Sequence, residues 1–71
     1  MRRRKRRSSW HHRKCRSNGG TDEVRNLSRV NMYDHQAWHR LFRNWEAERI
    51  SEVINEIWLD PDWELVARRR R

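Results

Sequence analysis

Cysteine, proline and long apolar runs are scarce in this chain of 71 residues. Its single cysteine, Cys15, excludes an internal disulfide and a zinc site made of several thiolates, and it favours a reducing, intracellular setting. No apolar run approaches the roughly 20 residues that span a bilayer, and the arginine-rich start is not followed by the apolar segment of a secretory signal. We therefore expect a cytoplasmic, nucleoid-associated or phage-associated protein with no signal peptide or transmembrane segment.

Apolar side chains are also few, since hydrophobic residues make up 34% of the chain and charged residues 39%. A chain of this length forms one domain whose core alone gives only marginal stability. A bound metal ion would stabilise such a fold, because the free energy of metal binding adds to that of folding.

Charge is distributed unevenly along the chain. The formal net charge is +8, with basic runs at Arg2–Arg7 and Arg68–Arg71, whereas seven of the ten acidic residues lie between Glu46 and Glu64. Basic surfaces bind polyanions because each phosphate contact releases condensed counterions. We expect a nucleic acid as partner, although such arginine tracts also occur as solvated tails or nuclear-localisation-like signals. The acidic stretch should face away from nucleic acid, where it could bind a protein partner or a second copy of the chain.

The residue pattern predicts an α+β fold that begins with a short hairpin. Residues 1–7 form a basic tail that should be disordered, because like charges repel and nothing there can be buried. A first short strand is expected over Ser8–Arg16 and a second over Leu27–Met32, joined through the turn-forming residues 17–22.

Two amphipathic helices are predicted to follow the hairpin. The first begins at or just before Asp34, capped by Asn31 or Asp34, and its apolar residues have the spacing of one buried face. The second should follow a break at Asn44 and end before Asp60–Pro61, because the residue ahead of a proline avoids helical angles. The two apolar stripes consist of Trp38, Leu41, Phe42 and Trp45, and of Ile50, Val53, Ile54, Ile57 and Trp58.

The tryptophans raise the question of base stacking. The helical spacing of Trp38, Trp45 and Trp58 favours the core instead. The sequence does not decide the role of Trp10, which could pack under the first strand or contact a nucleotide. An extended segment after Pro61 is expected to cover the core, with the apolar residues Trp63, Leu65 and Val66.

All four histidines fall in a pattern that suits a metal site. His35 and His39 are one helical turn apart and therefore lie on one helix face. Two imidazoles hold a divalent ion poorly, so a third ligand must come from the strand that carries His11 and His12. Because adjacent strand residues point to opposite faces, one of these two can bind the ion while the other stays free. Three protein ligands with open positions for water and phosphate are typical of a catalytic site rather than a closed structural one.

The run His11-His12, Gly19-Gly20, Asn26-Leu27, His35 and His39 resembles the motif of the HNH endonucleases, the ββα-metal nucleases. The resemblance covers about residues 10–40 and is closest to the nuclease colicins, which carry the doubled histidine where many relatives have Asp-His. It implies a hairpin and helix that bind one metal ion and hydrolyse phosphodiester bonds in DNA, leaving 5′-phosphate and 3′-hydroxyl ends. Residues 8–45 would form this motif, and residues 46–71 a C-terminal helix and basic tail packing on it.

The resemblance also implies roles for single residues. By position, His12 corresponds to the general base, His11, His35 and His39 to the metal ligands, and Asn26 to the residue whose amide holds the loop and orients His12. A neutral histidine is a competent base near pH 7. An all-imidazole ligand set favours Zn²⁺, Ni²⁺ or Mn²⁺ over Mg²⁺, but the sequence does not identify the ion among these four. The basic residues near the motif are candidates for phosphate binding: Arg13, Lys14, Arg16, Arg40 and Arg43.

Two other classes of protein share these features. The same site could hold a structural metal in a non-catalytic nucleic-acid-binding protein. The chain could also be an interaction module with an acidic docking helix and arginine tails as targeting signals. A free His12 beside a full set of ligands favours the enzyme, because a structural site has no need of it.

Overall fold

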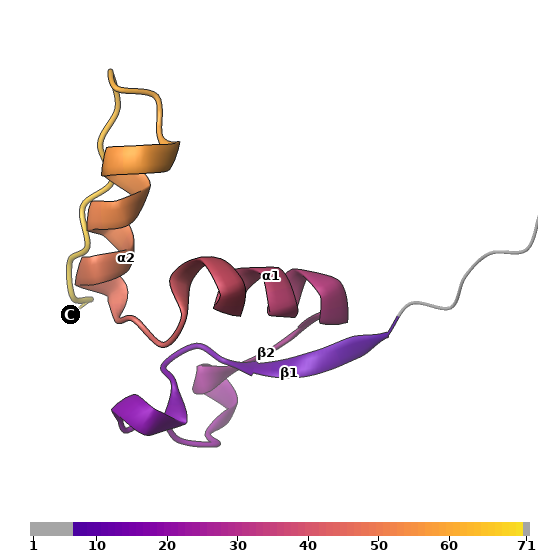
Figure 1. The fold of residues 1–71 in the computed structure, drawn as a ribbon. Coiled ribbons are helices and arrows are strands. Elements are labelled where there is room, and N and C mark those ends of the chain that lie inside the picture. The colour runs from indigo at the N-terminus through magenta and orange to yellow at the C-terminus, as the bar shows by residue number, and fades with distance from the viewer. Residues whose placement is uncertain (1–6, 71) are drawn as a thin grey trace, which may run out of the picture.

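The computed structural model describes residues 7–70 and has the α+β architecture expected from the sequence. An antiparallel hairpin of β1 (Ser8–His12) and β2 (Leu27–Asn31) is followed by helix α1 (Met32–Phe42). Figure 1 shows α1 lying across one face of this hairpin. Of the basic tail expected over residues 1–7, all but Arg7 lies outside the described residues.

The register of the hairpin decides which side chains face α1. Trp10 pairs with Arg29, and His11 pairs with Ser28. Because successive side chains alternate across a strand, Ser9 and His11 project to one face, where both meet side chains of α1. Trp10 and Arg29 project to the opposite, outer face.

The first strand is shorter than predicted, because the chain leaves it at His12 and folds into a compact loop that includes Arg16. Two 3₁₀ turns, Arg16–Asn18 and Val24–Asn26, shape this loop. Gly20 is required at its centre, since a Cβ there would collide with the carbonyl oxygen of Lys14. The loop therefore closes on itself by direct approach of backbone to backbone.

Helix α1 begins at a side-chain cap and ends at an unusual backbone turn. The Asn31 side chain accepts hydrogen bonds from the N–H groups of Tyr33 (2.8 Å) and Asp34 (3.3 Å), so Asn31 is the cap of the two candidates. After Phe42 the chain turns at Arg43, whose φ of 53° and ψ of −133° are rarely adopted by a residue with a side chain.

The turn after α1 ties the loop to the helix rather than capping the next helix. The Asn44 carbonyl oxygen accepts a hydrogen bond from the Asn18 side chain (2.6 Å), and its amide oxygen lies 3.5 Å from the Cys15 sulfur. The residue that precedes the second helix is Glu46, not the predicted Asn44, and its side chain makes no capping bond.

Residues 46–70 form a unit that we call the C-terminal arm. Helix α2 (Ala47–Val53) continues into a π-helical turn, η3 (Ile54–Trp58), which ends ahead of Asp60–Pro61 as predicted. The chain then runs back along α2, as the yellow segment of Figure 1 shows. The Asn55 side chain holds this segment by donating to the Leu65 carbonyl (2.9 Å) and accepting from the Leu65 N–H (2.8 Å).

The interior is small, and several predicted core positions are wrong. Within residues 7–70, Phe42 and Val53 are the buried hydrophobic side chains, whereas Trp58 is 60% exposed. Trp38 is 37% exposed and packs on Phe42 with ring centroids 4.7 Å apart, while Trp45 is half-buried. The two apolar stripes do not form one core, because α1 and α2 make few contacts with each other.

The extended segment after Pro61 lies along α2, but it does not bury its apolar residues as expected. Trp63 is 72% exposed and Val66 is similarly open to solvent. Over the part of the chain that the structure describes, no helix is long and apolar enough to cross a membrane.

Candidate metal centre

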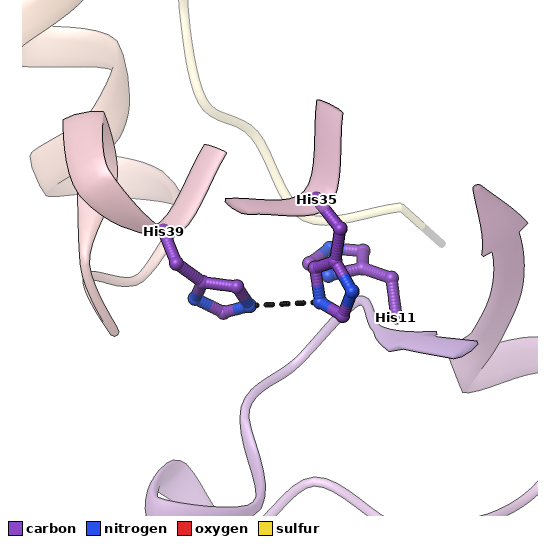
Figure 2. Close-up of side chains that lie close together, drawn as sticks. All are labelled: His11, His35 and His39. Carbon is purple, nitrogen blue, oxygen red and sulfur yellow. Dashed lines mark hydrogen bonds between the residues drawn. The ribbon is translucent and has the colours of Figure 1, made fainter. Parts of the chain in front are cut away.

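Three of the four histidines meet between the hairpin and α1. His11 comes from β1, and His35 and His39 come from one face of α1. One ring nitrogen from each lies within 4.8 Å of the other two, a spacing that one metal ion could bridge. Figure 2 shows the three rings turned toward one another. The family resemblance implied these three residues as the ligands, whereas the residue pattern alone left His11 and His12 as alternatives for the third.

Local structure explains this convergence. Residues four apart on a helix are neighbours on its surface, so α1 presents His35 and His39 together. The register of the hairpin points His11 at the same place, with its ring centroid 5.0 Å from that of His35 and 5.5 Å from that of His39. Trp38 closes one side of the cluster, at 6.0 Å from the His11 ring.

A chain of hydrogen bonds runs through the two helical histidines. The Ser9 hydroxyl lies 2.7 Å from Nδ1 of His35, and Nε2 of His35 lies 3.0 Å from Nε2 of His39. Nδ1 of His39 lies 3.3 Å from the carbonyl oxygen of Arg43. A carbonyl only accepts, so Nδ1 of His39 carries the proton. Nε2 of His39 is then left with a lone pair that can bind a metal ion.

The buried nitrogen of His11 is the clearest sign that the cluster suits a cation. Its Nδ1 is buried and has no hydrogen-bond partner among the described residues. Such an atom destabilises a fold unless something outside the chain satisfies it. A metal ion held by three imidazoles would do so, and the residues present therefore fit the metal site that the sequence predicted.

Electrostatics keeps the cluster in the form that binds metal. Burial, and next the neighbouring charges of His35 and His39, lower the pKa of His11 from its ordinary value of 6.5. Burial, followed by the charges of His39 and His12, lowers the pKa of His35 in the same way. Both rings are therefore neutral at pH 7, as metal ligation requires.

His12 lies outside the cluster and has a partner that the sequence did not indicate. Its Nε2 is 2.7 Å from a carboxylate oxygen of Asp22 in the loop between the strands. The hydrogen bond from His12, and next the charge of Arg16, lower the pKa of the Asp22 carboxyl below its ordinary value. Since a carboxylate accepts, Nε2 of His12 donates in this contact, and Nδ1 has no hydrogen-bond partner among residues 7–70.

Asn26 fastens the loop that carries Asp22. Its amide oxygen accepts from the Lys14 N–H (2.7 Å), and its amide nitrogen donates to the carbonyl oxygens of Lys14 (3.1 Å) and Thr21 (2.7 Å). The side chain thus joins the segment just after β1 to the residue before Asp22. The family resemblance implied that Asn26 holds the loop and orients His12; within residues 7–70 its side-chain hydrogen bonds go to Lys14 and Thr21.

The five basic residues predicted to bind phosphate are all exposed, and two of them contact other parts of the chain. Lys14 forms an ion pair with Glu46 (3.7 Å), and Arg13 donates to the carbonyl oxygen of Arg25 (3.4 Å). Lys14 therefore links the loop to the C-terminal arm. The remaining three are Arg16 in the loop, Arg40 near the end of α1 and Arg43 in the turn after it.

Two residues of the site escaped the sequence interpretation. Ser9 could have been found, because it is two residues before His11 and therefore shares its strand face. Asp22 could not, because its approach to His12 depends on the folded path of the loop rather than on any spacing in the sequence.

Comparison with family models, with curated proteins and with solved structures finds no match to this chain. Its function is therefore inferred from the site itself.

Proposed function

We propose that this protein is a metal-dependent endonuclease of the HNH type that hydrolyses phosphodiester bonds in DNA. One observation carries the proposal: three imidazole nitrogens converge on one point while the fourth histidine stays outside them, paired with a carboxylate. A structural metal site needs the three converging imidazoles but has no need of the fourth histidine outside them. A hydrolytic site uses both, because a base must remain free to activate water.

His11, His35 and His39 would hold the ion. When bound, a divalent metal at this position supplies charge stabilisation for a scissile phosphate and its leaving oxygen. The ligand set of three neutral imidazoles favours Zn²⁺, Ni²⁺ or Mn²⁺ over Mg²⁺.

His12 supplies the base in this proposal. Nδ1 takes a proton from the attacking water, because Nε2 is already committed to Asp22. The resulting imidazolium is stabilised by the Asp22 carboxylate, whose pKa is lowered by that same hydrogen bond. Asn26 acts through position, since it fixes the loop on which Asp22 is carried.

The substrate class follows from charge. Residues 7–45 carry eight Lys and Arg side chains against three Asp and Glu, and the basic tail precedes them. Such a surface binds the phosphate backbone with little dependence on sequence. The acidic C-terminal arm is excluded from that surface by its charge, and a protein partner or second copy bound there stays a prediction. An intracellular location, in the cytoplasm or with the nucleoid or a phage, belongs to the same proposal.

The test is incubation of supercoiled plasmid with purified protein and Zn²⁺, Ni²⁺, Mn²⁺ or Mg²⁺ in turn, with EDTA as the metal-free control. Nicking should require a metal and should disappear in His12→Ala, while metal affinity measured by calorimetry stays within about twofold. His39→Ala should lose both nicking and metal binding.

Two results would overturn the proposal. A His12→Ala protein as active as the wild type would remove the base. Wild-type protein that binds metal and DNA but cuts with none of the ions would instead favour a nucleic-acid-binding protein with a structural metal.

A further inference from the structure

The outer face of the hairpin carries an aromatic and cationic pair that the metal centre does not use. Trp10 on β1 and Arg29 on β2 are directly opposite each other in the register. Trp10 is 57% exposed, and the guanidinium carbon of Arg29 lies 5.5 Å from its ring centroid. α1 lies against the other face of the hairpin, so it does not cover this pair.

Arg29 is held in this position by a second contact. Its Nε donates to the Ser8 hydroxyl at 2.8 Å, and within residues 7–70 the terminal nitrogens of the guanidinium make no hydrogen bond, so they can meet a ligand. A cross-strand pair of this kind helps to hold the hairpin together. Holding the hairpin together does not explain why the Trp10 indole stays more than half exposed in a chain that buries so few apolar side chains.

The position of the pair relative to His12 points to its ligand. Trp10 and His12 are two residues apart on β1 and project to the same face, a separation of roughly 7 Å along the strand. The surrounding hairpin and loop, residues 8–31, carry five Lys and Arg side chains against two Asp and Glu, which favours an anionic ligand. An exposed indole beside a guanidinium is the combination that stacks on a nucleobase and contacts its phosphate.

We propose that Trp10 and Arg29 form a stacking subsite for one base of a single-stranded DNA segment, on the hairpin face that also carries His12. This inference rests on the proposed function for the choice of DNA as the ligand. In a paired duplex the base faces are covered by their neighbours and only base edges are open in the grooves. An indole face can therefore stack only on a base that is unpaired or displaced, and the substrate is a single strand, a gap or a locally opened duplex.

Binding in EDTA tests the subsite without any cutting. The probes are a short fluorescein-labelled oligothymidylate and a duplex of the same length, followed by fluorescence anisotropy. Trp10→Ala should weaken binding of the single strand about tenfold, and Trp10→Phe should keep most of the affinity because a flat ring remains. Trp63→Ala, which removes an exposed indole from the acidic arm, is the matched control and should change nothing.

The salt dependence of DNA binding distinguishes the contribution of Trp10 from that of Arg29. Trp10→Ala should leave the slope of log affinity against log salt unchanged, because the ring carries no charge. Arg29→Gln should weaken binding and also flatten that slope by about 0.7, the value for one phosphate contact on a single strand. Circular dichroism of each variant checks that the hairpin has folded.

The inference is overturned if Trp10→Ala binds the single strand as tightly as the wild type, or if it loses single-strand and duplex affinity equally. It is also overturned if Trp10→Phe is as weak as Trp10→Ala while both remain folded. Nuclease activity does not enter these measurements. A failure to cut plasmid would leave the stacking result standing, and a cutting enzyme without the Trp10 effect would refute the subsite alone.

Discussion

The Ser9 hydroxyl lies 2.7 Å from Nδ1 of His35, whereas His39 meets the other ring nitrogen, Nε2, at 3.0 Å. In the structure, Nδ1 of His39 donates to the Arg43 carbonyl, so Nε2 of His35 must donate to Nε2 of His39 and Ser9 must donate to His35. Metal binding moves the proton of His35 from Nε2 to Nδ1, because the nitrogen that binds the ion must carry no proton. A hydroxyl can rotate and accept from Nδ1 instead, so Ser9 can serve both forms of the ring.

Ser9→Ala should therefore weaken metal binding by about tenfold, the lower end of what loss of a ligand's hydrogen-bond partner costs. Ser9→Thr, which keeps the hydroxyl, should bind almost normally. Calorimetric titration with Zn²⁺ is the measurement. Ser8→Ala is the matched control, since Ser8 bonds Arg29 on the outer face. Equal affinities for the Ser9→Ala and Ser8→Ala proteins would show that Ser9 does not orient His35.

The pairing of Asp22 with His12 predicts a defect in rate rather than in metal binding. Asp22→Asn keeps the size of the side chain but removes the charge that stabilises a protonated His12, so the cutting rate should fall about tenfold or more. Zn²⁺ affinity should not change, because Asp22 is not part of the three-histidine cluster. Glu23→Gln removes the same charge from the next residue and should cut normally. A similar loss in both variants would assign the effect to net charge instead of to the His12 contact.

The lowered pKa values of His11 and His35 predict how the metal-free protein responds to acid. Burial is the main cause of both shifts, so the folded state binds fewer protons than the unfolded chain just below pH 6.5. The free energy of unfolding must then fall as the pH is lowered from 7 through the unfolded pKa toward the lowered folded values, and level off below them. Thermal melts in EDTA between pH 7 and pH 5 should show this as a falling Tm.

His35→Gln is the control for this pH effect, because glutamine does not titrate. Its Tm should depend less on pH over the same interval. A wild-type Tm that stays flat from pH 7 to pH 5 would mean that neither ring is kept neutral by the fold.

The parts of the structure that the sequence predicted well are those that depend on short periodic spacing. His35 and His39 had to share a helix face, and His11 had to face away from His12 on a strand. The hairpin and both helices follow from similarly local signals. The cap at Asn31 and the end of the helix ahead of Asp60–Pro61 follow from the chemistry of single residues.

The parts that could not be predicted depend on the path of the chain between elements. The interpretation of Trp58 as a core residue depended on helical spacing, which does not say whether another element covers that helix face. Trp58 is 60% exposed, and α1 and α2 make few contacts with each other. The contact between Asp22 and His12 needs the loop to fold back over Gly20, which no periodicity signals. The turn at Arg43 could not be predicted either. Arginine rarely adopts these backbone angles, so contacts elsewhere in the fold must hold the turn in place.

A substitution at Arg43 is predicted to change the stability of the fold without changing its affinity for metal. Its φ of 53° is strained for a residue with a side chain, and the contact it makes to His39 uses the main-chain carbonyl. Arg43→Gly should therefore relieve strain and raise the free energy of unfolding by about 1 kcal/mol, or roughly 4–8 °C in Tm for a domain of this size. Zn²⁺ affinity should be unchanged. Arg40→Gly, which removes the same charge from within α1, should lower stability by about 1 kcal/mol. An Arg43→Gly protein that melts below the wild type would show that the arginine side chain stabilises this turn by more than its backbone conformation costs.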